Sequence, residues 1–153
     1  MADGNEICRM DAVTLTSLVR SKRLSPVEVV DAVLARMERV EPLLHAFCTP
    51  TPELARAEAK RIEADMMAGR PLGALAGVPV GHKDLLLTKG VRTTSGSFAY
   101  KDFVPDEDDV VVAIRNRWYE QRESREGLTT PITAVASGFR SEIRLSCLQV
   151  VQA

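Results

Sequence analysis

Two neighbouring stretches decide the fold: residues 77–84 read Gly-Val-Pro-Val-Gly-His-Lys-Asp, and residues 88–97 read Thr-Lys-Gly-Val-Arg-Thr-Thr-Ser-Gly-Ser. The first is short, apolar and punctuated by glycine and proline, which is typical of a loop that enters a buried strand. The second is rich in glycine, serine and threonine, and it predicts a loop too polar for the core. Lys83 therefore stands where a predicted buried strand gives way to a polar loop.

The surroundings of Lys83 allow two interpretations. A lysine that follows an apolar strand loses hydration, which disfavours its charged form, and a neutral amine can act as a general base toward a serine hydroxyl. Alternatively, the side chain reaches solvent beside Asp84 as an ion pair, which is the commoner outcome for a lone lysine. If Lys83 points into a site, strand alternation turns His82 to the opposite face, where we expect a packed or exposed histidine and not a catalytic one.

Three helices are predicted upstream of this strand. The first begins near Asp11. The second opens at residues 25–28, Ser-Pro-Val-Glu, which form a capping box with proline at the first helical position. Pro42 predicts its end, because the residue before a proline is pushed out of the helical region. The third spans residues 52–68, with Gly69 placed to cap its carboxyl end.

The acidic residues 106–109 precede an apolar run, Val110 to Ile114, that predicts either a helix start or a short strand. A solvated loop and a helix cap explain the acidic cluster more simply than a cation site does. His45 and Cys48 are three residues apart, a spacing that metals use, but two ligands without a second pair are a weak signal. We therefore predict no metal site.

Taken together, these segments resemble the N-terminal part of the amidase signature family. That family has a Gly-Val-Pro-x-x-x-Lys-Asp strand followed by a Thr-x-Gly-x-x-Thr-Thr-x-Gly-Ser loop, and both halves stand here at the expected separation. Residues 24–30 resemble the family's second helix, and Ala46-Phe47 and Pro71-Leu72-Gly73 also fall in matching places. The resemblance spans about residues 11–116, and it is specific only because the motifs occur together.

The resemblance implies an α/β fold, in which N-terminal helices lead into a mixed sheet, and hydrolysis of carboxamide C–N bonds in small molecules without a cofactor. The family's mechanism uses a serine nucleophile, a second serine on a cis peptide bond, and a lysine that takes the nucleophile's proton through that second serine. By this resemblance Lys83 is the catalytic base. Six further residues support the site without doing chemistry: Asp84, Thr93, Thr94, Ser95, Gly96 and Ser97.

The chain departs from the family after about Asn116. The family's two serines lie further along its chain, in a stretch that includes a Gly-Gly-Ser-Ser-Gly-Gly run, and these 153 residues contain no such run. We expect residues 1–116 to be the N-terminal part of an amidase domain with an incomplete sheet. Residues 117–153 are expected to be a divergent tail, poorly ordered or weakly packed, such as a frameshift or alternative splice produces.

Charge and composition exclude several classes of partner. With 20 basic and 21 acidic residues and 5% aromatics, the chain offers no electrostatic or stacking surface for nucleic acid or an anionic membrane. Three scattered cysteines do not resemble a disulfide framework and favour a reducing compartment. The N-terminus lacks the pattern of a signal peptide, and no apolar run approaches the ~20 residues of a membrane span. These features predict a soluble, cytoplasmic protein.

Three functional hypotheses follow. The first is a truncated amidase that is inactive alone, because the nucleophile serine is missing. The second is a non-catalytic binding or regulatory fragment that associates with a full-length relative, or with itself, through exposed apolar surface. The third is an active enzyme that obtains serines from another chain or from an improvised local nucleophile. We rank them in that order.

Overall fold

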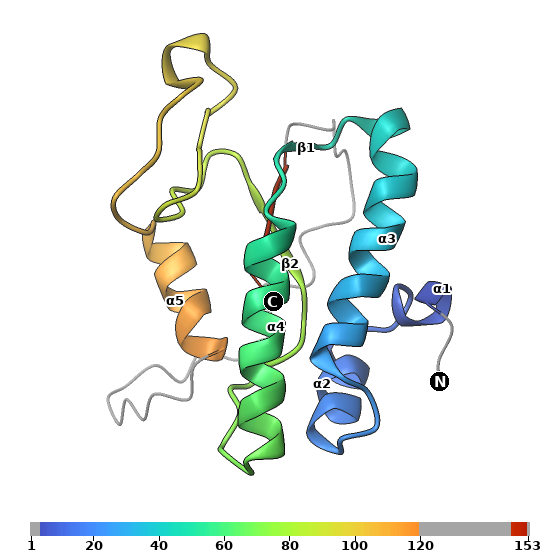
Figure 1. The fold of residues 1–153 in the computed structure, drawn as a ribbon. Helices are drawn as coiled ribbons and strands as arrows, with labels where there is room; N and C mark the ends of the chain where they lie inside the picture. Colours follow the sequence, from blue (N-terminus) through green and yellow to red (C-terminus); the bar gives the residue numbers. More distant parts are fainter. Residues whose placement is uncertain (1–3, 120–147, 153) are drawn as a thin grey trace.

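The computed structural model describes residues 4–119 and 148–152 (Figure 1). Its elements, in chain order, are α1 (Gly4–Ile7), α2 (Ala12–Arg20), α3 (Pro26–Leu44), β1 (Phe47–Thr49), α4 (Pro52–Met67), β2 (Val80–Lys83), the 3₁₀ helix η1 (Phe98–Tyr100), α5 (Val110–Tyr119) and β3 (Leu148–Gln152).

The three strands form one mixed sheet in the order β1-β3-β2. β3 runs parallel to β1 and antiparallel to β2, with Lys83 opposite Leu148 and Gly81 opposite Val150. α4 packs on β3, and in Figure 1 it lies in front of the sheet. Helices that lead into part of a mixed sheet confirm the predicted partial α/β fold.

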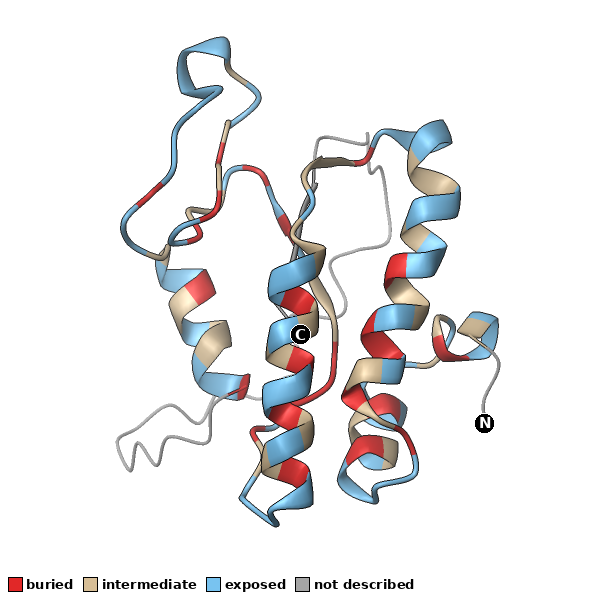
Figure 2. Cartoon of the chain, viewed as in Figure 1, coloured by how far each residue is buried: buried red, intermediate tan, exposed pale blue. Residues whose placement is uncertain are grey.

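α3 and α4 pack side by side and run in opposite directions (Figure 1). Four buried side chains form their interface: Val30, Leu34, Ala55 and Ala59. The two alanines let the helix backbones approach closely, because a methyl group fills little space. A second apolar cluster joins α1, α2 and α3 to the loop before β2, and it contains Ile7, Leu15, Leu24, Val29 and Val78. Figure 2 shows these buried faces turned toward one another.

The predicted capping box at the start of α3 is confirmed. The Ser25 hydroxyl accepts from Val27 N at 3.0 Å, and the Ser25 N–H donates to Glu28 Oε2 at 3.0 Å. The predicted end at Pro42 is wrong, because α3 continues to Leu44. Pro42 stands in the last turn, where its missing N–H removes only one helical bond, while His45 N still donates to Glu41 O at 2.8 Å.

The other helix predictions hold to within a residue or two. α2 begins after Asp11, whose carboxylate accepts from Thr14 N at 2.7 Å. α4 ends at Met67, and Gly69 follows with a φ of 69°, the left-handed conformation expected there. The apolar run after residue 109 forms a helix, α5, and Asp109 caps it by accepting from Val111 N at 3.1 Å.

Two parts of the predicted tail are described. Residues 117–119 complete α5, where Leu75 N donates to Trp118 O at 3.1 Å and the Tyr119 side chain is buried. Residues 148–152 form β3, the middle strand of the sheet. Residues 120–147 lie outside the described residues, so the domain boundary at residue 116 and the weak packing of the tail stay predictions.

Cys8 is a free thiol, whereas Cys48 is disulfide-bonded. The cysteine pattern did not predict this bond, and a reducing compartment would not favour it. Within the part of the chain that the structure describes, no helix is both long and apolar enough to cross a membrane.

Candidate functional site

Lys83 ends β2, and the loop that leads into this strand is tightly packed. Gly77 has a φ of 80°, and a Cβ on it would lie 2.9 Å from Cγ2 of Val19 on α2, so both backbone conformation and space require glycine there. Along β2 the side chains alternate: His82 is buried, at 7% exposed, whereas Gly81 and Lys83 are exposed. Lys83 therefore lies on the exposed face of β2, opposite the buried His82.

Asp84 is the buried anchor of the loop that follows β2, and only 3% of it is exposed. Its Oδ1 accepts from Thr94 N at 2.8 Å, and its Oδ2 accepts from the Thr94 hydroxyl. Its main-chain carbonyl accepts from Ser95 N at 2.9 Å. The structure thus brings together Asp84 and the turn at Thr94, ten residues further along the chain, and Lys83 directly precedes Asp84 in the sequence.

The rest of the predicted loop forms a tight turn and a helix cap. Ser95 and Gly96 have positive φ values of 51° and 67°, and Gly96 N donates to the Thr94 hydroxyl at 3.2 Å. The Ser97 hydroxyl accepts from Ala99 N at 3.2 Å at the start of η1. Ser95 is therefore a turn residue, and Ser97 caps η1.

Residues 88–109 form a two-limbed arm that projects from the helices (Figure 1). Gly90 N donates to Pro105 O and Thr93 N donates to Phe103 O, both at 2.9 Å, which joins the limbs. Thr93 is completely buried, and Thr88 and Val91 are also buried. The expectation that this loop is too polar to be buried is therefore wrong for its first limb, where the Thr88 hydroxyl donates to Leu86 O and the Thr93 hydroxyl to Val91 O.

A polar cluster lies on the other face of β2, and we name it the α5 cluster: His82, Asp108, Arg115, Asn116 and Tyr119. Nη1 of Arg115 contacts Nε2 of His82, and Nη2 of Arg115 donates to Asn116 Oδ1. Asn116 Nδ2 donates to Asp108 Oδ2 at 3.0 Å. The guanidinium of Arg115 lies 5.6 Å from the centre of the Tyr119 ring. The cluster joins the base of the arm, β2 and α5.

Burial dominates the electrostatics of the α5 cluster. Burial, aided by the positive charge of Arg115, lowers the pKa of His82 from 6.5 to about 4, against the opposing influence of Asp108. Burial also lowers the pKa of Arg115, while Tyr119 and Asp108 act in the opposite direction. Burial raises the pKa of Tyr119 to about 12. At neutral pH His82 is therefore uncharged beside a charged guanidinium.

Sequence reasoning missed this cluster, although a signal was present. Val112, Arg115 and Tyr119 are three and four residues apart, so they share one face of a helix. That face is turned toward β2, where Val112 and Tyr119 are buried, whereas Trp118 is partly exposed. The Tyr119 hydroxyl donates to Val78 O at 2.5 Å, which ties the end of α5 to the loop before β2.

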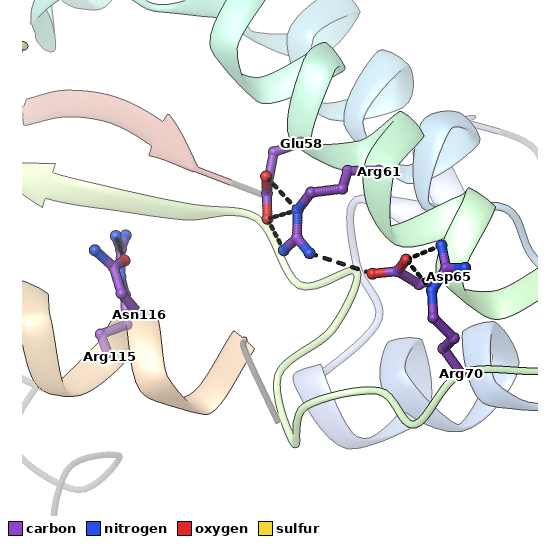
Figure 3. A network of polar contacts seen from close by, with 6 residues as sticks. All are labelled: Glu58, Arg61, Asp65, Arg70, Arg115 and Asn116. Carbon is purple, nitrogen blue, oxygen red and sulfur yellow. Dashed lines mark hydrogen bonds and ion pairs between the residues drawn. The ribbon is translucent and has the colours of Figure 1, made fainter. Parts of the chain in front are cut away.

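Figure 3 shows Arg115 and Asn116 of this cluster together with a second, unrelated network on α4. There Arg61 Nε donates to Glu58 at 2.9 Å, Arg61 Nη1 donates to Asp65 at 3.2 Å, and Arg70 Nε donates to Asp65 at 2.7 Å. The two arginines are exposed and the two acidic side chains are partly buried, and the pairs are spaced three to five residues apart. Such pairs solvate and modestly stabilise a helix surface, so we assign them no chemistry.

The described residues contain no group of three or more histidine, cysteine or acidic side chains that could hold a metal ion. His45 is exposed and caps α3 in the left-handed conformation, with a φ of 47°. It therefore has a backbone role at the end of a helix.

Comparison with known proteins identifies the family. The Amidase family model matches residues 28–116, which run from the first turn of α3 through α4, β2 and the arm into α5. This chain belongs to the amidase family. AmiD of Mycobacterium tuberculosis (strain ATCC 25618 / H37Rv), which carries the name of an amidase, is 36% identical over 111 residues, covering 72% of this chain and 23% of AmiD. A glutamyl-tRNA(Gln) amidotransferase subunit of Prochlorococcus marinus (strain MIT 9303) is 49% identical over 84 residues, covering 55% of this chain and 17% of that protein.

A solved structure has a similar fold over a comparable share of the chain. It is an inhibitor-bound complex described as a vestigial protein complex that reveals the evolutionary origins of an s-triazine catabolic enzyme. The similarity has a TM-score of 0.68 with 32% sequence identity, and it covers 72% of this chain and 24% of that one. This amidase-family chain therefore spans less than a quarter of the length of each of these relatives.

Proposed function

We propose that this chain is the lysine-bearing N-terminal part of an amidase-family hydrolase that acts on carboxamide C–N bonds of small molecules, and that it is inactive by itself. The observation that carries the proposal is the position of Lys83. It ends β2 inside the region matched by the family model, and the Asp84-anchored turn at Thr94 lies directly beside it. By resemblance to the family, Lys83 is the general base of a Ser-Ser-Lys mechanism.

Two features support inactivity of the isolated chain. The sequence contains no Gly-Gly-Ser-Ser-Gly-Gly run, so neither serine of that mechanism is supplied. The Lys83 side chain is also exposed.

The test is an amide-hydrolysis assay on the purified chain. A panel of aryl, alkyl and primary carboxamides is incubated with wild-type protein and with Lys83→Ala, next to an active amidase-family enzyme as a positive control. We expect no turnover above buffer for either form. Turnover by the wild type that Lys83→Ala abolishes would contradict inactivity and support a nucleophile from another chain or from a local serine.

A specific surface favours association as a second candidate function. Val111, Ile114 and Trp118 are exposed on one face of α5, at helical spacing of three and four residues. One relative is named as a subunit of an amidotransferase, and another is described as part of a protein complex. We propose that this stripe mediates association with itself or with a longer amidase-family chain.

Association is tested by light scattering after size-exclusion chromatography. The wild type and Ile114→Lys are compared, with Val13→Lys as control, because Val13 is an exposed apolar residue on α2. Association through the stripe predicts that only Ile114→Lys lowers the mass. A monomeric wild type at high concentration would contradict self-association. The predicted cytoplasmic location also remains part of the proposal, and fractionation of cells that express the tagged chain tests it.

A further inference from the structure

We propose that His82 and Arg115 form an acid-sensitive latch, which holds α5 on β2 while His82 is neutral and releases it when His82 takes up a proton. This inference goes beyond the proposed function, and it does not depend on any catalytic activity.

The latch follows from what the two side chains can donate and accept. Nη1 of Arg115 contacts Nε2 of His82. A guanidinium has donors only, so the ring nitrogen in this contact must be an acceptor, and the imidazole must be neutral with its proton on Nδ1. A protonated ring would place two cations and two opposing donors in contact, in a position where His82 is 7% exposed. Protonation and docking of α5 therefore exclude each other.

Among the described residues, Asp108 is the acidic group that acts on His82, and its influence is smaller than those of burial and Arg115. Asp108 lies at the base of the arm and acts on His82, but its Oδ1 accepts from Lys89 N at 2.7 Å and its Oδ2 from Asn116 at 3.0 Å. From α5, Arg115 contacts the ring and its positive charge opposes an imidazolium.

Other contacts also hold the second half of α5, and they are confined to one of its faces. The Tyr119 hydroxyl donates to Val78 O at 2.5 Å, and Trp118 O accepts from Leu75 N at 3.1 Å. The outer face, with Val111, Ile114 and Trp118, is exposed. A change in charge at His82 therefore acts on a short helix with one buried face, which is the kind of element that a single titration can shift.

The direction and size of the effect follow from the titration of His82. While α5 is docked, the pKa of His82 is about 4, and when α5 is released the pKa returns toward 6.5. The released state thus binds more protons between these values, so acid favours release. The equilibrium constant for release is expected to rise by up to about tenfold per pH unit as pH falls from 6.5 to about 4.

The chain carries its own reporter and control. Trp118 is the single tryptophan, and its main-chain carbonyl accepts from Leu75 N at the docked end of α5, while His82 and His45 are the only two histidines. The experiment follows Trp118 emission and acrylamide quenching of the full chain from pH 8 to pH 4. The variants are His82→Gln, whose amide oxygen still accepts from Arg115 but cannot be protonated here, and His45→Asn, which keeps the left-handed cap.

We expect a red shift and increased quenching between pH 6.5 and 4 in the wild type and His45→Asn, and a flat response in His82→Gln. An equal transition in His82→Gln, or no transition in the wild type, would overturn the latch. If His82→Gln fails to fold at neutral pH, NMR of the wild type decides. Titration of His82 below 6.5 that coincides with the Trp118 transition supports the latch, and titration at 6.5 without a change at Trp118 overturns it.

Discussion

Asp84→Ala tests whether the buried carboxylate organises the turn beside Lys83. The substitution removes two acceptors, for Thr94 N at 2.8 Å and for the Thr94 hydroxyl, while the main-chain bond from Ser95 N to residue 84 survives. Hydrogen bonds to a charged group contribute about 1.5–3 kcal/mol each. Thr94 is only half-buried, so water replaces part of this contribution. We therefore expect a loss of about 2–3 kcal/mol in the free energy that keeps the turn closed.

The assay is native-state hydrogen exchange at the Thr94 and Gly96 amides, with urea unfolding as a global measure. A loss of about 2–3 kcal/mol corresponds to roughly 30- to 150-fold faster exchange at Thr94. Asp102→Ala is the matched control, because Asp102 lies on the same arm, is 85% exposed and pairs with Lys101 at 3.7 Å. For Asp102→Ala, the free energy that keeps the turn closed should stay within about 0.5 kcal/mol of the wild-type value. Equal protection of Thr94 in the two variants would refute the anchoring role of Asp84.

Two further predictions concern the docking of α5. Gly73→Ala places a Cβ against the carbonyl oxygens of Trp118 and Tyr119, which are backbone atoms that cannot rotate away. We therefore expect the free energy of unfolding to fall by about 1–3 kcal/mol and the Trp118 emission to shift to the red. Gly4→Ala is its control, because that Cβ meets Ala32 at an ordinary 3.7 Å, and a similar loss there would contradict the steric argument. Burial raises the pKa of Tyr119 from 10 to about 12. As pH rises, the Tyr119 hydroxyl therefore loses its proton in the unfolded state before it does so in the folded state, and the free energy of unfolding falls by up to about 3 kcal/mol between pH 10 and pH 12. Urea unfolding from pH 9 to pH 12 should show this fall in the wild type and not in Tyr119→Phe.

Features that depend on a few neighbouring residues were predictable from the sequence. The capping box of α3 and the glycine after α4 each satisfy backbone groups within one turn, so spacing alone identifies them. The helix end predicted at Pro42 was wrong, because a proline only biases the preceding residue away from helical conformation. In the last turn of α3 the loss of one backbone hydrogen bond is tolerated, so the helix continues to Leu44. The α/β class and the family came from motifs that agree over most of the described chain.

Contacts between distant segments were not predictable in the same way. β1 and β3 are three and five residues long, and their pairing joins residues about a hundred positions apart, so no local period reveals it. The sequence places Arg115 next to the start of a divergent segment, yet its side chain contacts His82 in the middle of the strand motif. The resemblance named Asp84 and Thr94 as supporting residues but not their hydrogen bonds to each other, since ten residues of glycine- and serine-rich loop permit many conformations.

The central claim is that this chain carries the family's lysine without a working serine nucleophile. Treatment with a fluorophosphonate, which reacts covalently with activated serines, followed by intact-mass spectrometry, tests it without knowledge of the substrate. An active amidase-family enzyme is the positive control, and Lys83→Ala is compared with the wild type. We predict no adduct on this chain under conditions that fully label the control. A single serine adduct that forms on the wild type and disappears in Lys83→Ala would contradict the account.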